Sequence, residues 1–417
     1  MRTTAHLVRR SACAAALAVL ATGVASAPAL AAGTGVATLA ATDSTGFDGF
    51  GQSAALSGNG DVAVVGSPDH GTSGAGAAYI FTNDGQGFTQ STELTPPGTD
   101  SSELLGTSAA ISADGQTVVA GAPGDGNDTG AAFVFTDQSG TWTQTAKLVG
   151  AGASVNDQEG DSVAMSADAS TIVVTAPFSN GDGGAAYVFT KSGSTYAEVQ
   201  KLTTAGSATK KRKSPAPTAA DLLGFSAAVS SDGSTIVLGA PGTNGSAGAA
   251  DVFTKSGSTW TQTVQLVGAN TSTLDSFGLS VAVSGSGTTV AVGSPSSNGG
   301  DGSAYVFTES GGTFTQASQV LPPAGTSEAS AGTSIGMSSD GSIVAFGAPT
   351  LNFAGGVFVA TETNGTWALT ATDMPPNLAE DADLGHGATA VAGDGSAIIS
   401  GAASDGNVGE AFVFPVS

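Results

Sequence analysis

The sequence has very few cysteine, basic and histidine residues for its length. Its single cysteine is Cys13, so the chain beyond the first residues offers no disulfide and no thiol chemistry. Lysine and arginine number 11 against 34 acidic residues, which gives a formal net charge of −23. So acidic a surface is a poor partner for nucleic acid or for an anionic membrane. Imidazole chemistry is limited to His6, His70 and His386.

Residues 1–31 are predicted to be a signal peptide. Three early arginines precede an apolar run over 14–24, and a small-x-small cleavage site follows at 29–31. The run is too short to span a membrane, and no later segment is long enough to do so. We therefore expect an exported protein without membrane insertion, secreted or loosely associated with the cell surface. The pair Arg9-Arg10 leaves the twin-arginine route open beside ordinary secretion.

What the sequence does contain is a unit repeated seven times. Each copy opens at a glycine, and these glycines are Gly51, Gly106, Gly160, Gly224, Gly278, Gly332 and Gly385. Successive copies are 55, 54, 64, 54, 54 and 53 residues apart. A period this constant indicates one supersecondary unit that buries its faces against its neighbours, so residues 32–417 are expected to form one domain.

Each copy is expected to contain four short strands. In the copy that opens at Gly106 these strands cover 108–112, 116–121, 131–135 and 142–148. Asp114-Gly115 joins the first two and predicts a two-residue hairpin. Proline at position 123 ends the second strand, because proline cannot donate to a ladder. Four strands in each of seven units predict an all-β fold, a seven-bladed β-propeller with four-stranded antiparallel blades.

The two ends of the chain are expected to complete one blade. Residues 35–42 read as a fourth strand without a blade, and Leu39 lies twelve residues before Gly51, the same interval that separates Leu94 from Gly106. The seventh copy stops at its third strand, near 412–414. The N-terminal strand should therefore close the ring by completing the last blade, which removes two open sheet edges.

Short motifs recur at matching places in the copies. They are Phe-Gly at 50–51 and 277–278, Gly-Ala-Pro at 121–123, 239–241 and 347–349, Gly-Ser-Pro at 66–68 and 293–295, and Tyr-Val-Phe at 187–189 and 305–307. In these motifs the chain resembles the FG-GAP repeat family, to which the propeller of integrin α subunits belongs. Bacterial members also look similar in the W-x-Q-x-x-x-L strand, which occurs here at 142–148 and 260–266. The resemblance implies an integrin α-like propeller in a bacterial exported protein.

The metal sites of that family are not carried over to this chain. Metal-bearing repeats resemble EF-hand loops between strands one and two, whereas the expected connection here is as short as Asp114-Gly115. Such a turn cannot surround calcium with six or more oxygens. We therefore predict no cofactor, and weak binding of a divalent cation such as calcium stays open as an alternative.

One face of the propeller, named the upper face below, is expected to carry the binding function. It bears the loops that follow Gly-Ala-Pro and the loops between repeats, which are long and variable, whereas the opposite loops are short. The candidate binding residues in these loops are Asp69, His70, Asp125, Asn127, Asp128, Asp157, Asp182, Asp301, Asp383, His386 and Asp405. They could hold a divalent cation, attract a basic partner, or form only a solvated acidic rim.

The two later histidines give the most specific candidate. His70 and His386 lie in the first and last copies, which ring closure makes neighbours. With Asp69 or Asp383 they could form a small metal or acid/base site, although two histidines also fall on adjacent blades by chance. The serines show no G-x-S-x-G elbow, so no enzyme is assigned.

Two further features have simpler explanations. Six copies carry an aromatic residue at the start of the fourth strand, for which packing is favoured over sugar stacking: Phe88, Trp142, Tyr196, Trp260, Phe314 and Trp367. A ten-residue insertion before the fourth copy contains Lys210, Lys211, Arg212 and Lys213. It could be a processing site, an anchor to an anionic polymer, or a tolerated loop.

The sequence as a whole predicts a monomeric, exported, non-catalytic binding or adhesion protein that contacts an extracellular protein or glycan. The alternatives are an extracellular hydrolase or lyase that acts on a polymer, and a structural protein of the envelope or matrix.

Overall fold

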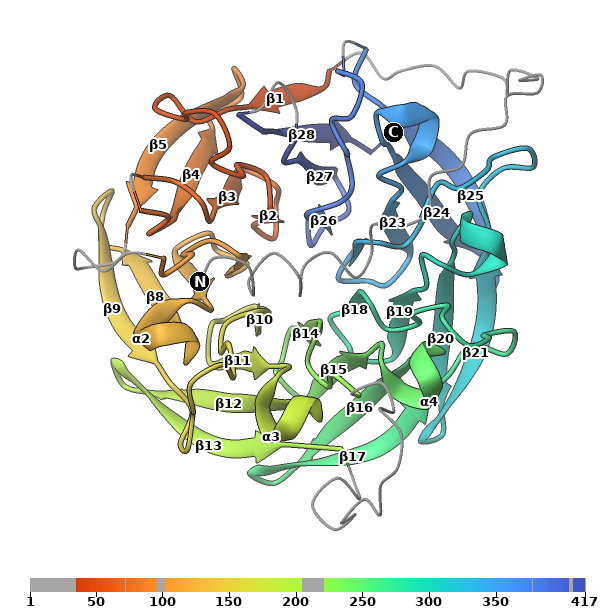
Figure 1. Cartoon of the computed structure of the whole chain (residues 1–417), viewed down its shortest axis with the longest axis horizontal. Coiled ribbons are helices and arrows are strands. Elements are labelled where there is room, and N and C mark those ends of the chain that lie inside the picture. The colour runs from red at the N-terminus through yellow and green to blue at the C-terminus, as the bar shows by residue number, and fades with distance from the viewer. Residues whose placement is uncertain are drawn as a thin grey trace, which may run out of the picture.

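The computed structural model describes residues 35–71, 73–95, 102–204, 221–376, 378–404 and 408–416. These residues form seven four-stranded antiparallel sheets, arranged as the blades of a β-propeller (Figure 1). The predicted fold class and blade count are confirmed. The predicted signal peptide lies outside the described residues. Within these ranges, no helix has both the length and the apolar character needed to cross a membrane.

Within each blade, the four strands are arranged in order from the centre of the ring outwards. The first strands are β2 (Ser53–Leu56), β6 (Ser108–Ile111), β10 (Val163–Met165), β14 (Ala227–Val229), β18 (Val281–Val283), β22 (Ile335–Met337) and β26 (Thr389–Val391). The second strands are β3 (Val62–Ser67), β7 (Thr117–Ala122), β11 (Thr171–Ala176), β15 (Thr235–Ala240), β19 (Thr289–Gly293), β23 (Ile343–Gly347) and β27 (Ala397–Ala402). The third strands are β4 (Ala77–Asn83), β8 (Ala131–Asp137), β12 (Ala185–Ser192), β16 (Ala249–Ser256), β20 (Ala304–Ser310), β24 (Val357–Thr363) and β28 (Glu410–Pro415). The outer strands are β5 (Phe88–Leu94), β9 (Trp142–Leu148), β13 (Thr195–Leu202), β17 (Thr259–Leu266), β21 (Thr313–Val320), β25 (Thr366–Asp373) and β1 (Ala37–Leu39).

The ring closes as predicted, because β1 is the outer strand of the last blade. It pairs antiparallel with β28, Thr38 lying opposite Phe412 and Leu39 opposite Ala411. Figure 1 shows β1 beside β28 although they lie at opposite ends of the chain. Leu39 is fully buried in a cluster with side chains of the first and last blades, among them Tyr79 and Ile399.

The second strands are buried on both faces. All six residues of β7 are buried, whereas in the outer strand β9 only the last residue, Leu148, is buried. Each blade packs between two neighbours, so its middle strands need apolar side chains on both sides. Val64 of the first blade and Val118 of the second, for example, share one hydrophobic cluster. The core is thus a ring of clusters at the interfaces between blades.

Glycine is required where the backbones of adjacent blades touch. A Cβ at Gly239, the glycine of a Gly-Ala-Pro motif, would lie 2.0 Å from the carbonyl oxygen of Gly278 and 2.3 Å from the hydroxyl oxygen of Ser226. The Ser226 hydroxyl donates to that same carbonyl. No side chain fits there without separating the two blades.

We expect Gly239→Ala to lower the free energy of unfolding by about 3 kcal/mol, a large overpacking cost because backbone atoms cannot move aside. Gly257→Ala serves as the control, since a Cβ there meets nothing within 4 Å and only the positive φ of 62° opposes it. The control should lose about 1 kcal/mol. Equal losses in urea unfolding would contradict the proposed backbone contact.

The predicted two-residue hairpin between the first two strands is wrong. Strand β6 ends at Ile111 and β7 begins at Thr117, and the backbone N–H of Ser112 donates to Thr117, so four residues form the loop. Of Asp114 and Gly115 only Gly115 has positive φ. The Asp114 carboxylate accepts from the Ser112 hydroxyl and the Gln116 N–H, which stabilises a longer turn than the dipeptide suggested.

The aromatic residues of the outer strands pack as expected. Trp260 is 1 % exposed, and its indole N–H donates to the carbonyl oxygen of Gly233 at 3.1 Å. The Tyr196 hydroxyl donates to Ala169 in the equivalent turn of the preceding blade at 2.7 Å. In both blades the aromatic ring therefore covers the turn between the first two strands.

Candidate functional site

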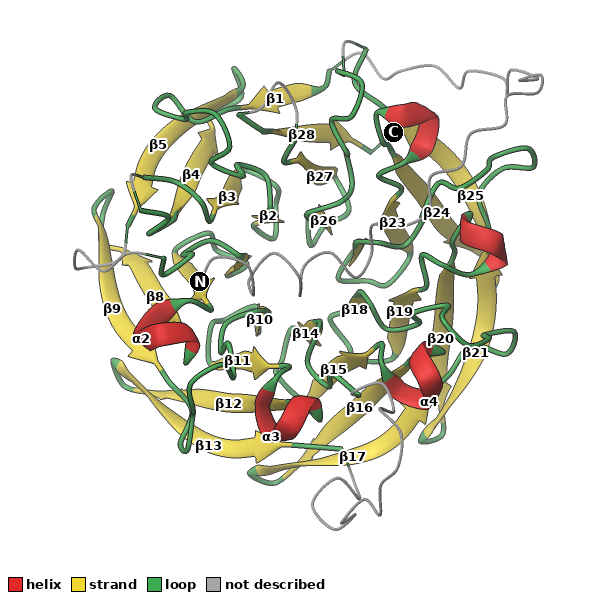
Figure 2. Cartoon of the chain, in the orientation of Figure 1, coloured by secondary structure: helices red, strands yellow, loops and turns green. Residues whose placement is uncertain are grey.

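The upper-face loops after Gly-Ala-Pro contain short helical turns, drawn red in Figure 2. These turns are α2 (Asp125–Asp128), α3 (Ser179–Asp182), α4 (Thr243–Ser246), η2 (Asn298–Gly300) and η3 (Leu351–Phe353). Left-handed residues, Asn127 and Asn180 among them, interrupt the turns. Asparagine and glycine accept this conformation at little cost, so the loops follow directly from their sequence.

The predicted binding residues are spread around the ring. Asp125, Asn127 and Asp128 lie in α2, Asp182 lies in α3, and Asp301 follows η2. Several of these acids stabilise the local backbone. Asp301, for example, accepts from the backbone N–H of Glu328 at 2.8 Å. Asp405 and the basic residues Lys210, Lys211, Arg212 and Lys213 lie outside the described residues.

Asp157 has the same kind of local role. It lies three residues before the opening glycine of its repeat and accepts from the Ser154 N–H at 3.0 Å. In other blades Asp48 accepts from the Thr45 N–H at 2.7 Å, and Asp275 from the Ser272 N–H at 2.6 Å. An acid at this position is therefore first a turn-forming residue.

Three positions meet at the upper edge of each blade, and we call them the edge triplet. They are the third residue after the alanine or serine of Gly-Ala-Pro or Gly-Ser-Pro, the first residue of the Tyr-Val-Phe or equivalent motif in the third strand, and the partner of that residue in the outer strand. In the first three blades the triplets are His70, Tyr79 and Glu93; Asp125, Phe133 and Lys147; and Ser179, Tyr187 and Lys201.

In the second blade, a lysine of the edge triplet neutralises the carboxylate of the same triplet. Lys147 forms an ion pair with the buried carboxylate of Asp125 at 2.6 Å, and its ammonium lies 5.3 Å from the centre of the Phe133 ring. Asp125, a predicted binding residue, is thus engaged by a lysine of its own blade.

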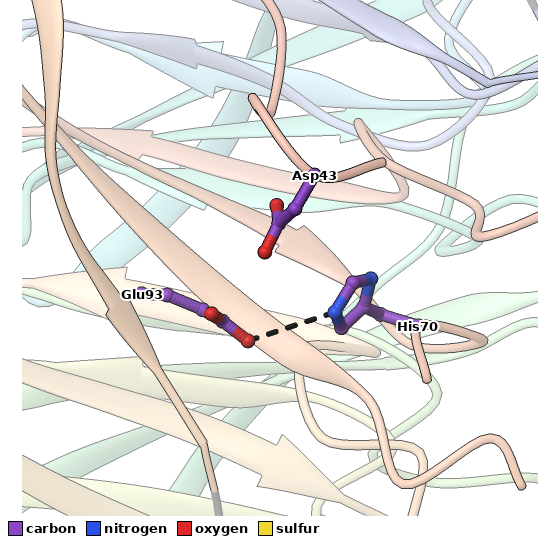
Figure 3. Close-up of side chains that lie close together, drawn as sticks. All are labelled: Asp43, His70 and Glu93. Carbon is purple, nitrogen blue, oxygen red and sulfur yellow. Dashed lines mark ion pairs between the residues drawn. The ribbon is translucent and has the colours of Figure 1, made fainter. Parts of the chain in front are cut away.

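The first blade carries the reverse arrangement, with the acid on the outer strand. His70 Nε2 lies 3.6 Å from Glu93 Oε1, and Asp43, just after β1, completes the group (Figure 3). One ligand atom from each of the three residues lies within 4.8 Å of the others. Burial and the Asp43 carboxylate raise the pKa of Glu93, while His70 lowers it.

A fourth side chain orients the imidazole. Asp48 Oδ2 lies 3.0 Å from His70 Nδ1. A carboxylate can only accept, so Nδ1 carries the proton and Nε2 faces Glu93. Burial raises the pKa of Asp48, but hydrogen bonds from Thr45 and His70 outweigh burial and hold the pKa below its ordinary value.

Tyr79 forms the floor of this group. Its ring packs edge-on against His70, with 5.8 Å between ring centres. Its hydroxyl is buried and makes no hydrogen bond within 3.5 Å, although the Asp43 carboxylate acts on it as a longer-range acceptor. Burial and the charges of Glu93, Asp43 and Asp48 raise the pKa of Tyr79.

Among the described residues, the group of ligand-type side chains around His70 contains Asp43 and Glu93 and does not include His386. The ring of His70 contacts Asp48 and Glu93 rather than Asp69, whose backbone N–H donates to the Asp48 carbonyl. The charge of His386 instead acts on Asp383 of its own blade, whose pKa burial raises and His386 lowers. Each histidine thus has carboxylates of its own.

The third blade buries a carboxylic acid beside its triplet. Glu159 is 0 % exposed, and one of its oxygens accepts from the Gly150 N–H at 2.7 Å while the other makes no hydrogen bond within 3.5 Å and interacts with Tyr187 at longer range. Burial raises the pKa of Glu159 to about 7. Lys201 donates to the Tyr187 hydroxyl at 2.8 Å, and burial together with Glu159 raises the pKa of that tyrosine.

Four residues of this site, Asp43, Asp48, Tyr79 and Glu93, were not predicted from the sequence. Alignment of the repeats on their opening glycines would have found three of them, because Asp48 occupies the turn-forming acid position while Tyr79 and Glu93 occupy the triplet positions. Asp43 lies in the connection from the last blade to the first, and only ring closure brings it to this site.

The exposed large hydrophobic side chains gather on the upper face. In the described part of the chain there are eight, and seven lie in upper-face loops: Phe47, Val149, Val155, Val267, Leu274, Leu321 and Phe353. The eighth is Val199 in β13. Phe47, Leu274 and Phe353 are the most exposed, at 79 %, 68 % and 80 %.

These three residues also have left-handed backbones. Their φ angles are 73°, 75° and 65°. The loops require this conformation, since Asn156 and Asp381, which match Phe47 in other copies, also have positive φ. Asparagine and aspartate adopt it readily, whereas a bulky side chain there is unusual.

Comparison with known proteins agrees with the repeats and the fold. A family model described as FG-GAP repeat matches residues 34–81, 88–135, 142–189 and 260–307, so the predicted resemblance is confirmed. No curated protein sequence matches the chain. Among solved structures, it is similar to hydrazine synthase from Kuenenia stuttgartiensis, with a TM-score of 0.58 and 14 % identity over 90 % of this chain and 98 % of that one. At this identity the likeness concerns the fold alone.

Proposed function

Because the chain contains FG-GAP repeats at four places and closes into a seven-bladed propeller, we propose that it is an exported binding or adhesion protein. In this proposal it is non-catalytic and contacts an extracellular protein or glycan through its upper-face loops. A propeller supports many functions, so the surface of this chain rather than its fold must indicate what it binds.

The observation that carries the proposal is the placement of the exposed hydrophobic side chains. Solvated loops gain nothing from Phe47, Leu274 or Phe353, and a residue such as asparagine would relieve the backbone at each position. Side chains that are both exposed and strained are typical of functional surfaces. Exposed aromatic and aliphatic residues are also the groups that supply binding energy when a partner covers them.

The export part of the proposal rests on the N-terminal sequence. Basic residues, an apolar run and a small-x-small site occur in the order of a secretory signal.

The test compares binding with stability in one set of variants. We expect the triple variant Phe47→Gly, Leu274→Gly and Phe353→Gly to bind its partner at least 10-fold more weakly, because hot-spot side chains contribute more than about 1.4 kcal/mol each. The same variant should unfold at an equal or higher temperature, since glycine removes about 1 kcal/mol of backbone strain at each site.

The readout is binding of the purified protein to arrays of extracellular matrix proteins and glycans. Val199→Ser is the matched control, because it removes an exposed hydrophobic side chain away from the upper face. Binding that survives the triple variant but fails in the control would refute the assignment of the face. Self-association that the triple variant abolishes, without any array hit, would favour the structural-protein alternative.

A further inference from the structure

Three ligand-type side chains meet where the two ends of the ring join. Asp43 follows β1, the outer strand of the last blade, whereas His70 lies between β3 and β4 and Glu93 lies in β5 of the first blade. Their facing atoms lie within 4.8 Å of one another, and Figure 3 shows the carboxylates of Asp43 and Glu93 turned towards the imidazole. One nitrogen and two oxygens in such a group form a donor set for a transition metal.

The imidazole is prepared for a metal by its neighbour. Asp48 is buried, and the Thr45 N–H and hydroxyl hold it at 2.7 and 2.8 Å. It fixes the Nδ1 proton of His70, so the Nε2 lone pair is available to a cation placed between Nε2 and the Glu93 carboxylate. Metal-binding histidines commonly have such a carboxylate on their second nitrogen.

Among the residues that the structure describes, the negative charge of the carboxylates at this site is not balanced by a lysine or arginine. In the second blade Lys147 neutralises the carboxylate of the edge triplet, but in the first blade the position of that lysine is Glu93. In the described part of the chain, no lysine or arginine forms an ion pair with Asp43, Asp48 or Glu93. His70 is therefore the one basic partner of these carboxylates there.

The buried hydroxyl beneath the group is incompletely satisfied. Tyr79 is 0 % exposed and its hydroxyl makes no hydrogen bond within 3.5 Å, the Asp43 carboxylate acting on it only as a longer-range acceptor beside the charges of Glu93 and Asp48. A buried polar group without a hydrogen bond costs free energy. A metal-bound water or a carboxylate drawn inwards by a metal would supply the missing hydrogen bond.

We propose that Asp43, His70 and Glu93 bind one zinc ion, with Asp48 as the positioning residue for His70. A tetrahedral zinc ion about 2 Å from each ligand separates the ligand atoms by about 3.4 Å. His70 and Glu93 already lie 3.6 Å apart, and the exposed Asp43 closes the remaining gap by rotation. Water takes the fourth position, because His70 and Glu93 remain partly open to solvent.

Zinc at this site would also join the two sides of the ring closure. Asp43 belongs to the segment that leaves the last blade, and the other two ligands belong to the first. The metal thus adds a link beside the hydrogen bonds of β1. This inference goes beyond the proposed binding function and does not depend on it.

The experiment is titration of the chelator-treated, purified full chain with zinc chloride by calorimetry, with elemental analysis of the product. We expect one zinc ion per chain, binding at least 100-fold weaker in His70→Gln and at least 10-fold weaker in Glu93→Gln. Asp48→Asn should weaken binding 10-fold to 100-fold while the stoichiometry stays at one. Calcium chloride should bind far more weakly, since calcium prefers oxygen ligands.

His386→Gln is the matched control and should bind zinc as the wild type does. Zinc should raise the melting temperature of the wild type and of this control but not that of His70→Gln, and circular dichroism checks that each variant folds. Absence of stoichiometric zinc in the wild type, or zinc affinity unchanged in both His70→Gln and Glu93→Gln, would overturn the proposal. Loss of binding in His386→Gln alone would overturn it as well.

Discussion

Replacing Leu39 by alanine should lower the free energy of unfolding by about 2–5 kcal/mol, the usual cost of removing a buried leucine side chain. Strand β1 has only three residues, yet Leu39 is fully buried where the first and last blades meet. The cavity left by the substitution would open between Tyr79 and Ile399, in the cluster that holds the two blades together. A loss at this place therefore weakens the whole ring rather than one loop.

The measurement is equilibrium unfolding in urea, with two controls. Leu148 of β9 occupies the matching position of an internal blade, so Leu148→Ala gives the cost of the same change in a strand that is continuous with its neighbours. Thr38 is exposed and adjacent, and Thr38→Ala should change stability by less than about 0.5 kcal/mol. A small loss for Leu39→Ala beside a normal loss for Leu148→Ala would mean that β1 is not needed for closure.

Ring closure could be predicted because the repeat carries its own register. The interval from the last leucine of an outer strand to the next opening glycine is twelve residues for Leu39 and Gly51, as it is inside the chain. Since side chains alternate between faces, this spacing fixes which face of β1 is buried. The family matches also begin with an outer strand and end with a third strand, so the sequence repeat is offset by one strand from the blade.

The turn between the first two strands was harder to predict, because a dipeptide does not define a loop by itself. Asp114-Gly115 is typical of a two-residue hairpin, but Ser112 offers a hydroxyl to the Asp114 carboxylate and this contact favours a longer turn. The same contact recurs between Ser230 and Asp232, where it helps to hold the aspartate pKa low against the effect of burial. Side-chain hydrogen bonds therefore decided the loop length.

The candidate site was predicted only in part, because its residues come from separate segments. His70 was predicted to be a site residue, with His386 of the last blade and with Asp69 or Asp383 as its partners. The structure supplies Asp48 and Glu93 instead. These contacts depend on how the loop after β3 folds against β5, and periodicity does not determine that.

Glu159 departs from the repeat pattern, and this departure has a predictable effect on stability. It occupies the position of the phenylalanine in Phe-Gly, where Phe50 packs against Tyr79 and Phe277 packs against Tyr305. In the third blade a carboxyl group takes the place of the ring, beside Tyr187. Because burial raises its pKa from 4.5 to about 7, the folded state binds more protons than the unfolded state between these two values.

The contribution of Glu159 to stability should therefore be complete below pH 4.5 and should be lost as the pH rises through about 7. A shift of this size corresponds to about 3 kcal/mol, at about 1.4 kcal/mol for each pKa unit. Glu159→Phe should remove this loss and restore the aromatic contact, and should stabilise the protein by about 3 kcal/mol at pH 8 but by much less at pH 5. Phenylalanine fits beside a tyrosine and a glycine at this place, since the fifth blade combines Phe277, Tyr305 and Gly268.

The decisive measurement is the difference in urea unfolding between variant and wild type at several pH values from 5 to 8. Subtraction removes the effect of the other buried carboxyl groups, such as Asp251, whose pKa burial also raises. Glu159→Gln keeps the shape without the charge, so its pH profile should match that of Glu159→Phe. Should Glu159→Gln instead follow the wild type over this range, the buried carboxyl would not be the group whose ionisation destabilises the third blade.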